Sequence, residues 1–295
     1  MDVNAEHLRT LAAVIDHGTF ERAALALHMT PSAVSQRMKA LEERAGRVLV
    51  RRSKPIAPTD AGRVLLRLAR QVALLEEEAA AELGGIDGST PAIPLVVNAD
   101  SLATWVLPAL ASLPHLVFEV GLDDQEHTLD RLRDGTAMAA IGSDADPVQG
   151  CTVSPLGAMV YRPVASPAFV ARWAAEGWTP EAAGVAPMLV YDRKDALQDR
   201  YLARFAPRAR PPRQYIPAST EFVRAAELGL GWGMLPDLQI VTHLAEGRLV
   251  VLDDAGAESV MLHWHQWSMR SDTLAAVADA IREHAAAALQ PPRRS

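Results

Sequence analysis

Four polar residues that can bond to nucleic acid lie on one side of the stretch 31–44. They are Ser32, Ser35, Gln36 and Lys39. Hydroxyl and ammonium groups donate hydrogen bonds to phosphates or base edges, and a glutamine amide can pair with adenine through two hydrogen bonds. The opposite side carries Val34, Met38 and Leu41 at the three- and four-residue spacing of a buried helix face. The stretch therefore predicts a helix whose polar side fits the DNA major groove.

Further helices are predicted to position this one. Thr30 and Pro31 give its start signal, a hydroxyl cap followed by proline at the first helical position. Thr19 caps a shorter helix in front of it, and another helix is expected over 4–17. Apolar residues at helical spacing give these helices one core, namely Leu8, Leu11, Ala12, Ile15, Ala23, Ala24 and Leu27. An ordinary pair of amphipathic helices with a solvated face is the alternative to a DNA reader.

A cationic loop follows the polar helix. Residues 48–59 predict a β-wing in which apolar residues precede a tip that carries Arg51, Arg52 and Lys54. Cations at such a tip can meet DNA phosphates. The residues expected to contact DNA are Thr30, Pro31, Ser32, Ser35, Gln36, Arg37, Lys39, Arg51, Arg52 and Lys54.

The charge of the chain is divided unevenly. Residues 1–59 contain nine Lys and Arg against six Asp and Glu, a net charge of +3, whereas the whole chain carries −7. The remaining residues, 60–295, therefore carry −10. A modestly basic head on an acidic body suits a protein that binds DNA with its head and repels DNA from its body.

The N-terminal pattern resembles the LysR-type transcriptional regulators, a family of winged helix-turn-helix proteins. The matching residues are Phe20, Ala23, Ala24, Leu27, Ser32, Ala33, Val34, Ser35, Leu41, Glu42, Gly46, Leu49, Arg52, Thr59, Ala61 and Gly62. The later segments 98–105, 229–234 and 262–265 are similar to the subgroup called LysG or ArgP. This resemblance covers almost the whole chain. It implies a regulator that binds double-stranded promoter DNA, responds to L-lysine or L-arginine, works with RNA polymerase and controls the export of basic amino acids.

Length and composition agree with a multidomain cytoplasmic protein. The chain has 295 residues, 49% of them hydrophobic, which is enough for two or three domains. No apolar run approaches the ~20 residues that cross a bilayer, and the N-terminus begins with a polar helix instead of a signal peptide. The single cysteine, Cys151, excludes an internal disulfide and a zinc site built from cysteines. It is expected to be a small apolar side chain rather than a redox sensor.

A long helix is predicted over 59–83, and its apolar residues form one seam. Steps of four, four, three, four and four residues join Val64, Leu68, Val72, Leu75, Ala79 and Leu83. A single helix of ~24 residues is a rod of ~36 Å that is unstable alone. We therefore expect Leu68, Val72 and Leu75 to pair with a second copy in a homodimer or homotetramer. Packing against the chain's own body is the alternative.

After a short polar linker, 86–91, the pattern changes to alternating strands and helices. Strands are expected over 93–97, 116–122, 137–141, 153–156, 160–165, 188–191, 233–235 and 260–267. Helices are expected over 101–113, 124–134, 195–205, 219–228, 237–245 and 272–289. This order predicts an α/β fold with a parallel sheet.

The family resemblance implies two α/β subdomains like those of periplasmic binding proteins, with ligand in the cleft between them. Crossover segments are expected near 161–165 and 264–268. The expected parts are a winged helix-turn-helix over 1–59, a linker and dimerisation helix over 60–85, subdomain I over 91–162 and 266–290, and subdomain II over 163–265.

Polar residues at strand ends and helix starts are the candidate ligand groups. Segment 98–101 opens a helix, where backbone N–H groups and the Ser101 hydroxyl can hold an α-carboxylate. Lysine also brings two ammonium groups, and burying either one requires a nearby carboxylate. Each acid taken singly fits a helix cap or a solvated surface better than a ligand contact. The residues expected at the ligand are Asn98, Asp100, Ser101, Asp123, Asp124, Ser143, Asp192, Ser219, Thr220, Glu221 and Trp232.

Two further motifs suggest other chemistry. Residues 229–233 are rich in glycine, but they lack the spacing of a nucleotide-binding loop, and Trp232 is expected to form a wall of the cleft. His263 and His265 share one face of a strand and form a potential metal pair. No third ligand is evident, so core or hinge packing is favoured, and neither a metal nor a cofactor is expected.

Two other functional classes stay open. An enzyme needs a nucleophile, a base and an orienting group within reach of one another, and the sequence offers no hydrolase elbow, metal triad or cofactor fingerprint. We therefore expect no catalytic residues. A DNA-binding protein of the nucleoid or of a replication origin that works without effector is the stronger alternative. Ligand-dependent changes in a DNA footprint distinguish it from a regulator.

Overall fold

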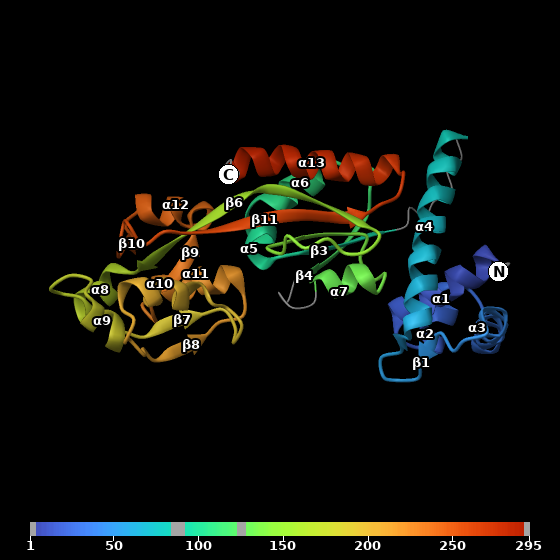
Figure 1. Ribbon diagram of the computed structural model, residues 1–295, viewed down its shortest axis with the longest axis horizontal. Coiled ribbons are helices and arrows are strands. Elements are labelled where there is room, and N and C mark those ends of the chain that lie inside the picture. The colour runs from blue at the N-terminus through green and yellow to red at the C-terminus, as the bar shows by residue number, and fades with distance from the viewer. Residues whose placement is uncertain (1–3, 84–91, 123–127, 292–295) are drawn as a thin grey trace.

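The computed structural model describes residues 4–83, 92–122 and 128–291, which form a head, a long linker helix and an α/β body (Figure 1). The head and the linker helix lie at one end of the molecule. Subdomain I of the body lies next to the linker helix, and subdomain II lies at the far end. No helix in these ranges is long and apolar enough to cross a membrane.

Helices and a small wing form the head. They are α1 (Ala5–His17), α2 (Phe20–Ala26), α3 (Pro31–Ala45), β1 (Val50–Arg51) and β2 (Ala57–Pro58). The predicted caps are confirmed, because the Thr19 hydroxyl accepts a hydrogen bond from the Arg22 N–H at 3.1 Å. The Thr30 hydroxyl likewise accepts from the Ala33 N–H at 3.2 Å. Leu49 at the base of the wing joins the expected apolar residues in one core.

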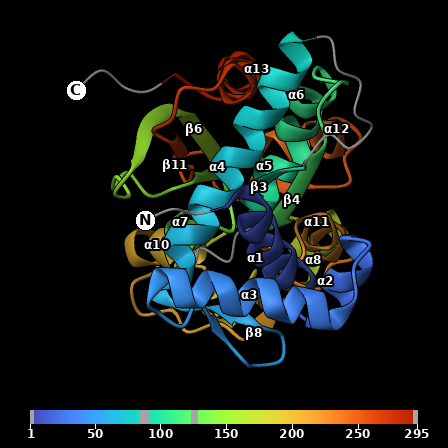
Figure 2. The same ribbon diagram turned by 90° about the vertical axis from the view of Figure 1, so that its right-hand side faces the viewer.

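Helix α4 (Asp60–Glu82) links the head to the body (Figure 2). Leu65, Leu66 and Ala69 belong to the core of the head, and Leu74 belongs to the core of the body. The helix is therefore stabilised within its own chain. These four residues lie outside the predicted seam, so they do not decide whether the seam packs against the chain's own body.

The predicted seam of α4 remains mostly on the surface. Val64, Leu68 and Leu75 are 68%, 36% and 46% exposed. Val72 differs from them, because it packs against the head core. The helix thus presents an apolar stripe that its own chain does not cover.

Polar contacts fasten α4 to subdomain I. Arg67 donates hydrogen bonds to the carbonyl oxygens of Arg133 at 2.9 Å and of Gln149 at 3.3 Å. One turn earlier, Arg63 pairs with Asp134 at 3.1 Å. Because the carbonyl of Arg133 lies at the C-terminal end of a helix, its partial negative charge favours a cation there. These contacts join the linker helix and subdomain I into one body.

One large sheet runs through the body, and a small sheet lies in subdomain II. In the described residues the large sheet has seven strands in the order β10-β6-β11-β5-β3-β4, with β9 also paired to β6. They are β3 (Ile93–Val97), β4 (Phe118–Leu122), β5 (Ala139–Gly142), β6 (Cys151–Ala165), β9 (Gly233–Pro236), β10 (Val250–Val251) and β11 (Glu258–Trp267). The small sheet pairs β7 (Met188–Val190) with β8 (Arg213–Tyr215) in parallel.

The prediction of a parallel sheet is wrong for most of the large sheet. The β3–β4 and β3–β5 pairs are parallel, whereas the described pairs that involve β6 or β11 are antiparallel. The order of strands and helices along the chain shows the parallel units. It does not show that the long strand β11 returns through the middle of the sheet, between β5 and β6, in the opposite direction.

Strands β6 and β11 connect the two subdomains. The sequence predicts two strands, 153–156 and 160–165, but β6 is one strand of 15 residues. Gly157, at φ +151°, takes up the bend between them, and pairing with β11 continues past it. The crossover expected at 264–268 is also wrong, because residues 263–266 pair with β5 inside subdomain I. β11 therefore passes from subdomain II to subdomain I nearer its N-terminal end.

Helices cover both subdomains. Those of subdomain I are α5 (Ala99–Ser101), the π-helix η1 (Leu102–Val106), α6 (Leu107–Ala111), α7 (Thr128–Arg133) and α13 (Asp272–Ala288). Those of subdomain II are α8 (Pro167–Trp173), α9 (Pro180–Val185), α10 (Leu197–Phe205), α11 (Ser219–Glu227) and α12 (Asp237–Ala245). Helices α8 and α9 are not predicted from the sequence, since seven and six residues are too few to display a helical period. The linker at 86–91 and the expected helix start at 124 lie outside the described residues.

Candidate functional site

The exposed side of α3 carries polar residues predicted to contact DNA. Ser32, Ser35, Gln36 and Lys39 are exposed, and the opposite side of the helix is buried in the head core. The Lys39 Nζ lies 3.7 Å from the Glu43 Oε1, but both side chains remain mostly exposed. Arg37 instead pairs with Glu6 of α1 at 2.9 Å. The structure therefore presents the seryl, glutaminyl and lysyl groups to a partner and holds Arg37 against the head.

The wing places further cations beside α3. Arg52 and Lys54 are exposed on the wing. Arg51 bends back to donate to the carbonyl oxygen of Pro58 at 3.3 and 3.4 Å. Figure 2 shows the wing directly below α3. A duplex that accepts α3 in its major groove would place a phosphate strand near this wing.

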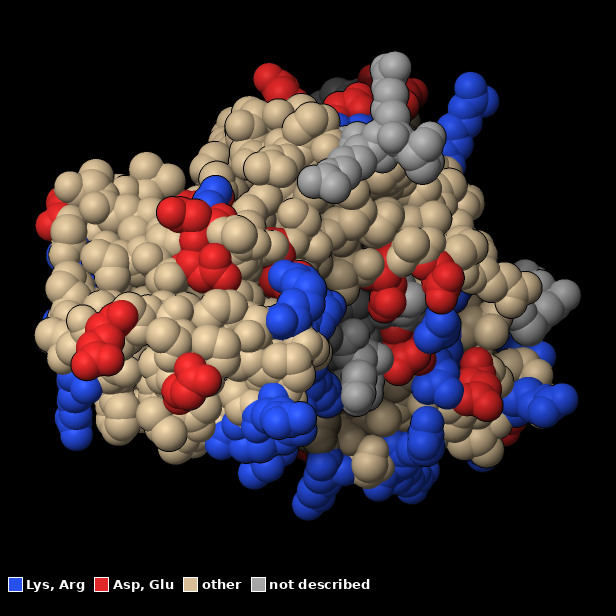
Figure 3. Space-filling view, turned by 60° about the vertical axis from the view of Figure 1, so that its left-hand side comes forward, with Lys and Arg blue, Asp and Glu red and all other residues tan. Residues whose placement is uncertain are grey.

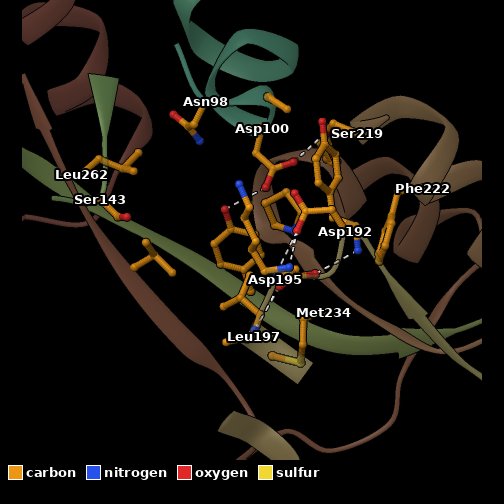
Figure 4. A pocket seen from close by; sticks show the side chains of 18 of the residues that line it. Asn98, Asp100, Ser143, Asp192, Asp195, Leu197, Ser219, Phe222, Met234 and Leu262 are labelled. Atoms are coloured by element: carbon orange, nitrogen blue, oxygen red, sulfur yellow. Dashed lines mark hydrogen bonds between the residues drawn. The ribbon is translucent and has the colours of Figure 1, made fainter. Parts of the chain in front are cut away.

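A second polar site lies in the body, in a cavity of about 170 Å³ between the two subdomains (Figure 4). Its walls come from α5 in subdomain I, from the crossing strands β6 and β11, and from α10 to α12 in subdomain II. Its polar lining residues are Asn98, Asp100, Ser143, Tyr161, Tyr191, Asp192, Lys194, Asp195, Arg200, Ser219 and Gln239. The cavity lies beyond the carboxyl ends of β3 and β7, where a ligand site is expected in parallel α/β units.

Asp100 joins the two subdomains across this cavity. Its carboxylate accepts hydrogen bonds from the Tyr161 hydroxyl at 2.8 Å and from the Ser219 hydroxyl at 2.6 Å (Figure 4). Gln239 donates to Ser219 at 2.7 Å and extends the chain of hydrogen bonds to α12. Burial raises the pKa of Asp100, although both hydroxyl donors act in the opposite direction. A desolvated carboxylate of this kind gains strongly from a cation that enters the cavity.

Asp192 and Asp195 form a turn at the end of β7. Asp192 accepts from the backbone N–H groups of Lys194 at 2.7 Å and of Asp195 at 2.9 Å. Asp195 accepts from the N–H groups of Tyr191 and Leu197, both at 3.0 Å. These hydrogen bonds fix the direction of both carboxylates. Together with Asp100, they give the cavity three acidic groups.

Asn98 offers an unused acceptor. Its side-chain oxygen is buried and has no hydrogen-bond partner among the described residues, although the residue lines the cavity. Ser143 lies at the exposed rim. Ser101 is fully buried and the cavity does not reach it, which corrects the expectation that its hydroxyl holds a ligand. A buried polar atom without a partner, as at Asn98, points to a ligand or water that would complete it.

Three other expected ligand residues lie away from the cavity. Thr220 and Glu221 are exposed on another side of α11 and line a separate groove beside α12 and α13. Each step along a helix turns a side chain by ~100°, so these residues cannot face the cavity that Ser219 faces. Trp232 is fully buried in the core of subdomain II, with its ring centroid 5.4 Å from that of Trp178. Asp123 and Asp124 lie outside the described residues.

Several groups of the cavity were not predicted from the sequence. They are Tyr161, Tyr191, Lys194, Asp195, Arg200 and Gln239. Asp195 had a local signal, because it is an acidic residue just before a helix and just after a buried strand, and it accepts from the Leu197 N–H where that helix begins. Tyr161 and Gln239 had none, since they lie inside a strand and a helix and reach the cavity through tertiary packing.

The histidine pair of β11 lies away from the cavity. His265 is fully buried, and its Nε2 lies 3.0 Å from the carbonyl oxygen of Asp144. Burial lowers the pKa of His265 and so favours the neutral ring. Within the described ranges no group of three or more His, Cys, Asp or Glu is placed to hold a metal ion. Packing in the core of subdomain I accounts for this residue.

Comparison with known families identifies both parts of the chain. Residues 5–63 match the family described as bacterial regulatory helix-turn-helix protein, lysR family, and residues 91–286 match the LysR substrate binding domain. The chain belongs to the LysR family. It is therefore a DNA-binding transcriptional regulator rather than an enzyme, and its fold is that of LysR-type regulators.

Individual relatives place this LysR-family regulator near LysG and ArgP, which confirms the predicted subgroup. The lysine export transcriptional regulatory protein LysG of Corynebacterium efficiens is 41% identical over 293 residues, covering 98% of this chain and all of the relative. The crystal structure of ArgP from Mycobacterium tuberculosis has a TM-score of 0.86 and 42% identity, covering 99% of this chain and 100% of that chain. Full-length LysG from Corynebacterium glutamicum with bound effector Arg has a TM-score of 0.74 and 36% identity, covering 98% and 100%.

Proposed function

We propose that this regulator senses a basic amino acid, L-lysine or L-arginine, in the cavity between its subdomains, and thereby controls transcription of an amino-acid export gene. The observation that carries the proposal is the set of three carboxylates, Asp100, Asp192 and Asp195, around one cavity. The relatives support it, because one is named for lysine export and another holds arginine as its effector.

The cavity offers a partner for each part of such a ligand. Its three carboxylates can pair with the α-ammonium group and with the cation of the side chain. The unpartnered oxygen of Asn98 can accept a further N–H, and Arg200 at the cavity wall can attract the α-carboxylate. Phe222 and Met234 can contact the aliphatic part. Leucine has no second cation, so it would leave buried negative charge unpaired.

The head is proposed to read DNA with the exposed residues of α3 and to bind phosphates with Arg52 and Lys54. Leu68 and Leu75 of α4 are proposed to pair with a second copy, so that a homodimer or homotetramer sets two heads on two half-sites. We further propose that the complex works in the cytoplasm and contacts RNA polymerase at the promoter. The bounds 1–59 and 60–85 remain the proposed head and linker.

Calorimetry on the full-length protein tests the effector. L-Arginine or L-lysine should bind at micromolar levels and L-leucine at least tenfold more weakly, a difference of ~1.4 kcal/mol. Asp195→Asn should weaken arginine more than leucine. Glu221→Gln is the matched control, because this exposed carboxylate lies outside the cavity and its loss should leave both affinities unchanged. The proposal fails if the wild type binds no basic amino acid or binds leucine equally well.

A DNA footprint tests whether the effector matters to transcription. Saturating arginine should change the region of promoter DNA that the regulator protects. An unchanged footprint would instead support an effector-independent DNA-binding protein of the nucleoid or of a replication origin.

A further inference from the structure

A group of arginines lies on the acidic body, around the turn between α10 and β8. We name Arg193, Arg204, Arg208, Arg210 and Arg213 the α10–β8 basic surface; all are exposed. Residues 193–213 contain seven Lys and Arg against two Asp, a net charge of +5, which exceeds the +3 of the whole head. Since residues 60–295 carry −10, the rest of the body carries −15. This segment is therefore a local reversal of the charge of the body.

Internal contacts leave much of this charge available to a partner. Among the described residues, neither Arg208 nor Arg210 is paired with a carboxylate. Arg210 donates to two neighbouring carbonyl oxygens, and Arg193 stacks over the ring of Tyr215 at 5.2 Å. Neutral acceptors and rings of this kind hold the side chains at the surface without cancelling their charge. The other two arginines of the surface are paired with carboxylates.

The chemistry of the segment favours phosphate as the partner group. Six of its seven cations are arginines. The planar guanidinium fork matches two oxygens of a phosphate, whereas a lysine ammonium acts as a point charge. The rest of the body is acidic and repels polyanions. The clustered arginines of this segment give a local positive potential that attracts one.

The α10–β8 basic surface lies on the same side of the molecule as the DNA-contacting part of the head. In Figure 1, both β8 and the wing lie at the lower boundary of the molecule, and Figure 2 shows the wing at the lower boundary again. Figure 3 shows Lys and Arg side chains gathered along this lower edge, while much of the upper part is uncharged. A duplex held by the head can therefore continue beneath subdomain II. We propose that the α10–β8 basic surface binds the phosphate backbone of duplex DNA beside the half-site that the head reads.

Two properties follow from a contact with phosphates alone. The contact adds affinity without sequence preference, and each phosphate that it neutralises makes the dependence of log K on log[salt] steeper by ~0.9. It also lengthens the stretch of DNA that the protein needs for full affinity. Both properties are independent of the amino acid in the cleft.

Binding of full-length protein to two duplexes tests the proposal. One duplex carries a single half-site without flanking DNA, and the other carries the same half-site with arbitrary sequence added on both sides. Arg208→Gln combined with Arg210→Gln should weaken binding to the long duplex several-fold at low salt and reduce the salt slope by ~1–2. Binding to the short duplex should not change. Arg172→Gln combined with Arg282→Gln is the matched control. It removes the same charge from two exposed arginines that lie on α8 and α13, outside the α10–β8 basic surface.

A second variant distinguishes the loss of positive charge from a change in folding. Arg208→Lys combined with Arg210→Lys keeps the charge and should retain most of the affinity for the long duplex. Unchanged affinity and salt slope in the glutamine variant would overturn the proposal and leave the surface to an acidic protein partner. Equal loss on both duplexes would also overturn it, since the head rather than the flanking DNA would then be affected. None of these outcomes depends on amino-acid binding, so they do not bear on the effector proposal.

Discussion

At the residue scale, Asp100 combines the features that make a carboxylate respond to a ligand. It lies between the subdomains and accepts hydrogen bonds from two hydroxyl groups, and burial raises its pKa. A raised pKa in the folded protein means that the carboxylate takes up a proton at a higher pH than an ordinary aspartate. The ionised form, which a basic ligand needs, is therefore lost earlier on acidification.

We therefore expect the affinity for arginine to fall as the pH is lowered from neutrality, before an ordinary aspartate would titrate. Asp100→Asn should bind arginine at least tenfold more weakly at neutral pH, a loss of ~1.4 kcal/mol, and should lose most of this pH dependence. Calorimetry over this pH range makes the measurement. If the variant keeps the wild-type pH profile, Asp100 does not contact the ligand cation.

The head allows a prediction about sequence reading. Gln36 is exposed on α3, so Gln36→Ala should cost ~1–3 kcal/mol on the cognate site and relax the base preference at one position. Arg52→Ala and Lys54→Ala should weaken binding to all sequences alike, because phosphates carry no sequence information. Titration against cognate and random duplexes distinguishes the loss of base reading from the loss of phosphate contacts. An equal loss on both duplexes for Gln36→Ala would refute its role in base reading.

At the element scale, α4 carries both internal and external contacts, and the exposed stripe predicts assembly. Leu68→Glu combined with Leu75→Glu should shift the protein toward monomer in sedimentation, because charges would lie in a buried helix seam. Val72 is a poorer target, since it also packs against the head core. Val185→Glu, at an exposed apolar position on α9, is the control. An unchanged oligomer would mean that the bodies hold the assembly together.

The other end of α4 is joined to α13 by a carboxylate. Glu78 accepts from the Ser271 hydroxyl at 2.6 Å and from the Thr273 N–H at 2.9 Å. Burial alone would raise the pKa of Glu78, but these hydrogen bonds outweigh it and lower the pKa. A lowered pKa in the folded state means that the contact stabilises the protein above the ordinary glutamate pKa and is lost as the pH falls through the folded value.

Glu78→Gln should therefore loosen the start of α13 at neutral pH, and this difference from the wild type should disappear in acid. The loss of stability should be at most ~1 kcal/mol, because the carboxylate is only partly buried. Hydrogen exchange of the first turn of α13 measures the effect, with Glu77→Gln as the control. Unchanged exchange in the Glu78 variant would show that apolar packing at Leu74 is sufficient.

At the scale of the whole molecule, the contacts of α4 join the head, the linker helix and subdomain I, and none of those named here reaches subdomain II. Arg67 and Glu78 fasten the linker helix to subdomain I, whereas the cavity lies between subdomain I and subdomain II. A ligand that bridges the cavity is therefore expected to draw subdomain II toward a unit made of head, linker helix and subdomain I. The movement of subdomain II, rather than a change inside the head, would carry the signal.

Hydrogen exchange with and without arginine tests this division. Arginine should slow exchange in 98–101, 191–200 and 219–222, which border the cavity, and leave the helices of the head unchanged. L-Leucine at the same concentration is the control. Slower exchange throughout α1, α2 and α3 would contradict the expectation that arginine leaves the structure of the head unchanged.

The sequence by itself determined the head and the family. Caps, proline at the first helical position and three- to four-residue apolar spacing act over a few neighbouring residues, so Thr19, Thr30 and Pro31 mark helix starts before any fold is known. The exposed side of α3 and the apolar seam of α4 followed from the same periodicity. The net charges also identified a basic head, but they hid the positive segment 193–213 inside an acidic total.

Tertiary structure decided the cleft. Asp100 and Ser219 are 119 residues apart and become neighbours because α5 and α11 begin on opposite sides of one cavity. The choice of Ser219 over Thr220 depends on the rotation of a helix, and the burial of Trp232 depends on aromatic rings from other elements. Local patterns report which residues can start an element or face a core. They do not report which elements meet, because that is set by packing between segments distant in the chain.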